Sequence, residues 1–101
     1  MTLELGGNIT LAGFDSRDFT EMIVVKKMVG QYARQFSDHI TGFSGLKITL
    51  KSVHETKSEI HVLAAIDGHE VTSTETAHNL YIALDTSLKK SYEQARKHVA
   101  N

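Results

Sequence analysis

The six histidines are the residues best suited to chemistry, because an imidazole can bind a metal ion or transfer a proton near neutral pH. They are spread along the chain at His39, His54, His61, His69, His78 and His98. His61 and His69 fall on opposite faces of a predicted hairpin, and His78 and His98 lie roughly 30 Å apart on one predicted helix. The other two lie in or next to loops. Because no pair has the close spacing of a zinc site, we predict no metal and no cofactor.

The carboxylates have structural roles that explain them without catalysis. Asp15 and Asp18 come at a predicted helix start, where a negative charge is favourable, and Asp67 belongs to a predicted turn. Asp85 precedes Lys89 by four residues on a predicted helix, so an ion pair along the helix accounts for it. The chain has no cysteine and no nucleophile-elbow, phosphate-loop or dinucleotide motif. We therefore predict that the chain is not an enzyme.

The basic side chains are the better candidate, because lysine and arginine bind phosphate groups. Residues 26–57 and 76–101 each hold more Lys and Arg than Asp and Glu, although the formal net charge is only −1. The predicted RNA-binding residues are Lys26, Lys27, Lys47, Lys51, Lys89, Lys90, Arg96, Lys97 and His98. Two alternatives stay open: these charges could simply be solvated faces, and cations near a helix C-terminus are favoured by the helix dipole alone.

The composition is that of one globular domain, residues 1–101. Hydrophobic residues make up 41% and charged residues 23%, ordinary values for such a domain. No apolar run approaches the roughly 18–20 residues needed to cross a bilayer, and the start of the chain lacks the pattern of a signal peptide. We therefore expect a cytoplasmic protein without a membrane partner.

The elements that must position the basic residues begin with a strand near 8–13 and a helix at about 17–38. Asp18 and Glu21 have capping-box spacing. After them, apolar residues recur at three- and four-residue steps and predict one buried helix face. Gly30 interrupts this helix at a cost of roughly 1 kcal/mol relative to alanine, for which a close helix–sheet contact is the simplest reason.

Three strands follow a loop at 41–45. Alternating apolar residues predict strands at 46–52 and 60–66, with Lys47 and Lys51 on the outer face of the first. Asp67-Gly68 predicts a two-residue turn, which pairs Ile66 with His69 and leads to a third strand ending near residue 73. The two longer strands keep their apolar residues on one face only if an odd-length loop joins them, and residues 55–59 satisfy this.

The last element is a long helix whose final turns are basic. Thr74 or Thr76 can cap it, and its apolar stripe consists of Leu80, Leu84, Leu88, Tyr92, Ala95 and Val99. The resulting order is β-α-β-β-β-α. We predict the α+β class: a two-layer sandwich with both helices on one face of a mostly antiparallel four-stranded sheet, as in double-stranded-RNA-binding domains.

The C-terminal half resembles the ribosome hibernation-promoting factor family in its small single-domain form. The similarity lies in the hairpin from Ile60 to Ser73 and the helical run Asn79-Leu80-Tyr81-Ile82-Ala83-Leu84-Asp85. Lys90, Gln94, Lys97 and His98 match the Lys, Gln and Lys-His positions of the family's final helix. The resemblance implies docking on the small ribosomal subunit, in the channel used by messenger and transfer RNA, with Lys90, Lys97 and His98 contacting ribosomal RNA.

Two functions from different classes follow. The first is non-catalytic binding of the small ribosomal subunit and its RNA, which would inhibit translation or stabilise idle ribosomes. The second is a small protein–protein module, a homodimer formed through the exposed sheet face or edge, where Leu63 and Ala65 leave apolar surface. Steep salt dependence would favour the first, and a dimer that persists at high salt would favour the second.

Overall fold

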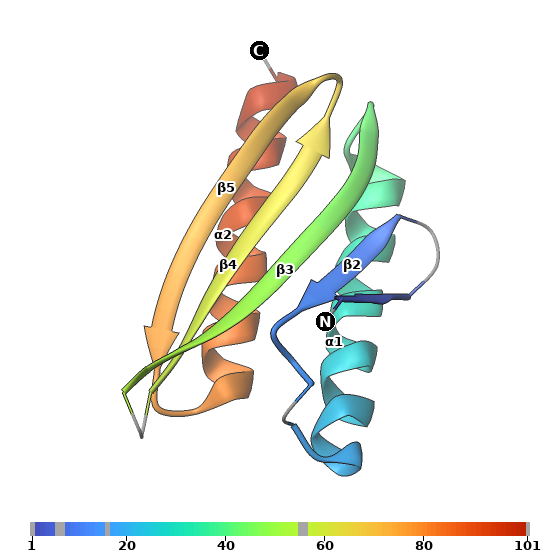
Figure 1. Cartoon of the computed structure of the whole chain (residues 1–101). Helices are drawn as coiled ribbons and strands as arrows, with labels where there is room; N and C mark the ends of the chain where they lie inside the picture. Colours follow the sequence, from blue (N-terminus) through green and yellow to red (C-terminus); the bar gives the residue numbers. More distant parts are fainter. Residues whose placement is uncertain (1, 6–7, 16, 55–56, 101) are drawn as a thin grey trace.

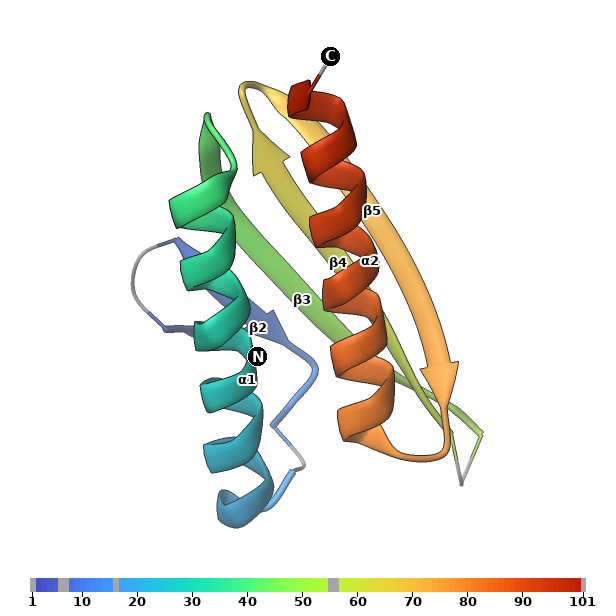
Figure 2. The same cartoon turned by 180° about the vertical axis from the view of Figure 1, so that it is seen from behind.

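The computed structural model describes residues 2–5, 8–15, 17–54 and 57–100. In chain order the elements are β1 (Thr2–Glu4), β2 (Ile9–Ala12), α1 (Phe19–His39), β3 (Phe43–His54), β4 (Lys57–Ile66), β5 (His69–Ala77) and α2 (Leu80–Ala100). Both helices lie on one face of a single sheet (Figures 1 and 2). The predicted fold class, an α+β sandwich of β-α-β-β-β-α order, is confirmed.

The sheet is mixed and its strands lie in the order β1-β2-β3-β4-β5. Among the described strands, the β2–β3 pair is parallel, and the β1–β2, β3–β4 and β4–β5 pairs are antiparallel. The predicted strand at 8–13 corresponds to β2, and β1 adds a short fifth strand beside it. The central strands are longer than predicted, because β3 begins at Phe43 and β4 at Lys57, within the expected loops. The remainder of the predicted 55–59 loop, residues 55–56, lies outside the described residues.

The predicted register of the hairpin is confirmed. Ile66 pairs with His69 and Ala64 with Val71, as a two-residue turn at Asp67-Gly68 requires. Asp67 has the positive φ of 53° that such a turn needs. Strand parity then places alternate residues of β4 against the helices, where Ile60, Val62, Ala64 and Ile66 are buried.

Helix α1 starts as the sequence predicts. Asp18 is the N-cap, and its carboxylate accepts a hydrogen bond from the Glu21 amide at 2.8 Å. The expected role of Gly30 is wrong: this residue is exposed, and a Cβ built there meets no atom within 4 Å. Gly13 is different, because its φ is +83° and a Cβ there would collide with the Leu50 carbonyl. Glycine is therefore required at position 13 and not at position 30.

Helix α2 starts later than predicted. Strand β5 continues to Ala77, so neither Thr74 nor Thr76 is the cap. The side chain of Asn79 caps the helix by accepting hydrogen bonds from the Tyr81 and Ile82 amides at 2.8 and 3.1 Å. Strand pairing with β4 has overridden the capping preference of the two threonines.

The core lies between the sheet and the helices, and α2 covers β4 and β5. The buried face of α2 is partly polar. The Ser73 hydroxyl of β5 donates a hydrogen bond to the Ser87 carbonyl at 2.7 Å and lies 2.8 Å from the Ser91 hydroxyl. Tyr92 of the predicted stripe is half-buried, and the side chain of Val99 lies outside the description. The small serine side chains leave α2 close to β5 while keeping their polar atoms bonded.

Candidate nucleic-acid interface

The two helices form one outer layer that carries most of the predicted RNA-binding residues. On α1, Lys26 and Lys27 are exposed. On α2, Lys89, Arg96 and Lys97 are exposed as well. Because the sheet covers the opposite side of both helices (Figure 2), these five cations share the helical layer of the molecule.

Two of the predicted residues on α2, Lys90 and Arg96, make contacts within the fold. Lys90 forms an ion pair with Glu75 of β5, so part of its charge is neutralised within the fold. Arg96 lies over the ring of Tyr92, with its guanidinium carbon 5.9 Å from the ring centre, a cation–π arrangement. His98 belongs to α2, but its side chain lies outside what the structure describes.

Lys47 and Lys51 lie on the other layer. They are exposed and alternate along β3 with the buried Leu46, Ile48 and Leu50, so they project from the open face of the sheet. The structure therefore does not gather all of the predicted basic residues on one surface.

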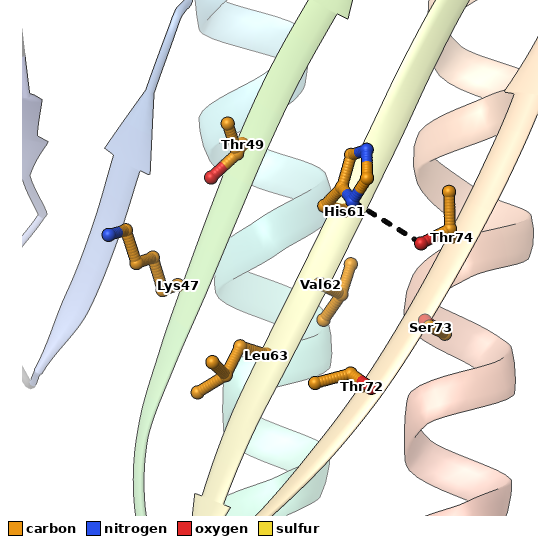
Figure 3. A pocket seen from close by; sticks show the side chains of 8 residues that line it. All are labelled: Lys47, Thr49, His61, Val62, Leu63, Thr72, Ser73 and Thr74. Carbon is orange, nitrogen blue, oxygen red and sulfur yellow. Dashed lines mark hydrogen bonds between the residues drawn. The ribbon is translucent and has the colours of Figure 1, made fainter.

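The open face of the sheet contains a hollow of about 330 Å³ beside Lys47. Figure 3 shows its lining: Lys47, Thr49, His61, Val62, Leu63, Thr72, Ser73 and Thr74. His61 is held from both sides, because its Nε2 lies 2.6 Å from a Glu59 carboxylate oxygen and its Nδ1 lies 3.3 Å from the Thr74 hydroxyl. The sequence placed His61 on this face. The threonines around it were missed, although Thr72 and Thr74 alternate along β5.

The histidines of the described residues do not assemble into a metal centre. His61 faces the open side of the sheet opposite Thr74, whereas His69 pairs with the core-facing Ile66, as expected from strand parity. Within the described ranges there is no group of three or more His, Cys, Asp or Glu side chains that could hold a metal ion.

A polar and aromatic seam fixes the two helices side by side. Tyr32 of α1 donates a hydrogen bond to Asp85 of α2 at 2.8 Å. Two turns on, the Tyr92 hydroxyl lies 3.0 Å from His39 Nδ1, and the Tyr92 ring packs edge-on against Phe36. Burial, followed by the hydrogen bond and the charge of Asp85, raises the pKa of Tyr32 to about 12. These contacts link the two helices directly. The seam was missed in the sequence because it joins residues 53 positions apart.

No helix in the described part of the chain is long and apolar enough to cross a membrane.

The architecture and surface define the class of protein: an α+β sandwich whose helical layer is exposed and basic. No protein-family model matches the sequence, and no curated protein matches it either.

Two solved structures share this architecture over nearly the whole chain. The N-terminal domain of Protein Y from Thermus thermophilus is 16% identical, with a TM-score of 0.65, covering 90% of this chain and 94% of that domain. A ribosomal subunit interface protein from Coxiella burnetii is 12% identical, with a TM-score of 0.67, covering 93% of this chain and 97% of its own. At these identities the similarity establishes the fold, and at that level the resemblance seen in the sequence is confirmed.

Proposed function

We propose that this chain is a non-catalytic ribosome-binding domain that contacts RNA of the small subunit and keeps the ribosome idle. The observation that carries the proposal is the fold similarity, over 93% of the chain, to a ribosomal subunit interface protein, and the N-terminal domain of Protein Y shares the same fold over 90% of the chain. The match spans nearly the whole chain, so the similarity concerns the complete domain. A ribosomal partner also implies a cytoplasmic location.

The surface chemistry supports RNA as the ligand. Lys26 and Lys27 of α1 and Lys89, Arg96 and Lys97 of α2 are exposed on the helical layer, and phosphate contacts of this kind position a protein on RNA without reading bases. Lys47 and Lys51 form a second, smaller basic area on the sheet. In a channel lined by RNA, both layers can contact phosphates, with the helical layer making the larger contribution.

Charge reversal on each layer tests this assignment. We expect Lys27→Glu with Lys89→Glu to weaken binding to small subunits by at least about tenfold, and to reduce the steepness of the salt dependence by about one unit per lost phosphate contact. The matched pair Lys47→Glu with Lys51→Glu should weaken binding less. Lys90 is left unchanged, because its reversal would place a carboxylate against Glu75 and destabilise the fold.

Co-sedimentation with purified small subunits gives the affinities, and thermal unfolding confirms that both double variants remain folded. Binding at the wild-type level by both variants would exclude RNA contacts through these surfaces.

The second candidate function is a homodimeric interaction module. It is favoured by β5, which ends the sheet as a nine-residue edge strand, and by the partly exposed Leu63 and Ala65 on the open face. An unpaired edge of this length can pair with a second copy. Sedimentation equilibrium at high salt separates the two functions, since a dimer that persists there, with no ribosome association, supports the module.

A further inference from the structure

The side of α1 that faces away from α2 has chemistry that the fold itself does not use. Its residues are Phe19, Ile23, Lys26, Lys27, Gly30 and Arg34, which we call the outer α1 stripe. They recur at three- and four-residue steps and so lie along one side of the helix for about 22 Å. The sheet-facing side is occupied by the buried Val25 and Val29, and the seam occupies the side toward α2.

The stripe begins with two exposed apolar side chains. Phe19 is 81% exposed and Ile23, one turn later, is 52% exposed. Asp18 provides the cap of the helix, so Phe19 is not needed to start α1. A phenylalanine this exposed leaves most of its surface open to a ligand.

Gly30 is the second unexplained feature of the stripe. It weakens the helix relative to alanine, yet its surroundings are open and its φ is not in the left-handed region. Nothing in the described fold requires the absence of a side chain there. Close approach of an external molecule to the helix backbone would require it.

The charge of the stripe selects the kind of partner. From Met22 to Ser37 the helix has no Asp or Glu, while Lys26, Lys27 and Arg34 surround Gly30. A second copy docked on the stripe by two-fold symmetry would bring Lys26 and Lys27, at the middle of the stripe, close to the same lysines of the other copy, which is unfavourable. A ligand with both negative charge and flat apolar surfaces complements the stripe, and unpaired RNA has both.

We propose that the outer α1 stripe binds a single-stranded segment of RNA. One unstacked base lies on the Phe19 ring beside Ile23, and the sugar-phosphate backbone crosses Gly30 between Lys26, Lys27 and Arg34. The inference rests on the proposed function, and it specifies where and how the RNA is held.

Substitutions at Phe19 test the stacking contact. Phe19→Ala should weaken small-subunit binding at least about fivefold, the lower range for loss of one base–aromatic stack. Phe19→Leu should weaken small-subunit binding by the same amount, because leucine retains apolar area but has no flat ring on which a base can stack. Wild-type affinity for Phe19→Leu would indicate apolar contact with a protein and overturn the proposal. Gln35→Ala is the control, an exposed residue on another side of α1.

Substitutions at Gly30 separate binding from folding. Gly30→Ala and Gly30→Gln should both raise the melting temperature, because both residues are better helix formers than glycine. Binding should weaken progressively from glycine to alanine to glutamine as the added side chain obstructs the backbone of the RNA. Unchanged affinity for both variants would overturn the proposal, and their higher melting temperatures would exclude misfolding as the cause of any loss.

Photo-crosslinking identifies the occupant directly. A benzophenone amino acid replacing Phe19, irradiated in the complex with small subunits, should give a product that ribonuclease digestion shortens. A crosslinked product that ribonuclease does not shorten would place a ribosomal protein on the stripe and overturn the inference. The proposed function would still stand in that case, because the chain would have bound the small subunit. Failure of the wild-type chain to bind small subunits would overturn both.

Discussion

Gly30 occupies an exposed position in the middle of α1 that alanine can fill without a clash. We expect Gly30→Ala to raise the free energy of unfolding by about 0.5–1 kcal/mol, which moves the melting temperature up by a few degrees. Denaturant unfolding monitored by circular dichroism measures the change.

Gly13 is the matched control, because alanine there has a positive φ and meets the Leu50 carbonyl. Gly13→Ala should destabilise the domain by more than about 1 kcal/mol. Equal effects of the two substitutions would contradict the different roles given to these glycines.

Tyr32 makes stability sensitive to alkaline pH. Its pKa is raised to about 12, first by burial and then by Asp85, so the fold favours the neutral phenol over the phenolate. The stability that the fold gains from the neutral phenol is fully present below the ordinary tyrosine pKa of about 10. It is lost as the pH rises toward 12. We expect the phenolate absorbance of the wild-type chain to include a step near pH 12 that Tyr32→Phe lacks.

Asp85→Asn supplies the check on the cause. It removes the negative charge beside the phenol while retaining an acceptor, so the pKa of Tyr32 should fall toward 10. An unchanged titration of Tyr32 in this variant would leave burial as the only cause.

At the scale of elements, the start of α2 depends on Asn79. Its side chain satisfies the amides of Tyr81 and Ile82, and loss of such a cap costs about 0.5–2 kcal/mol. We therefore expect Asn79→Ala to lower the free energy of unfolding by that amount. Thr76→Ala, at the position the sequence suggested as a cap, should change it by only a few tenths of a kcal/mol. A larger loss of stability for Thr76→Ala than for Asn79→Ala would show that the helix begins earlier than Leu80.

The sequence predicted the elements well where periodicity was strong and poorly where two local preferences competed. The β4–β5 register followed from the Asp67-Gly68 turn and from strand parity. The position of the α2 cap did not, because threonines 74 and 76 favour both caps and strands, and only pairing with β4 decides between them. The length of β3 was underestimated because Ser44 and Gly45 are typical of loops.

At the scale of the whole molecule, the arrangement in two layers followed from the sequence, and the distribution of the candidate site did not. Alternation along β3 placed Lys47 and Lys51 opposite the buried residues, but only the packing of both helices shows that the remaining basic residues lie on the other layer. The ion pair of Lys90 with Glu75 and the Tyr32–Asp85 seam join distant segments. Such contacts follow from the fold and leave no local pattern.

The central claim, that this chain binds the small ribosomal subunit through phosphate contacts, is tested most directly by co-sedimentation of the wild-type protein with purified small subunits across a salt series. We predict binding at low salt and an affinity that falls by at least about tenfold between 50 and 200 mM salt, with a linear relation between the logarithms of affinity and salt concentration. Absence of binding at every salt concentration, or binding that does not change with salt, would contradict it.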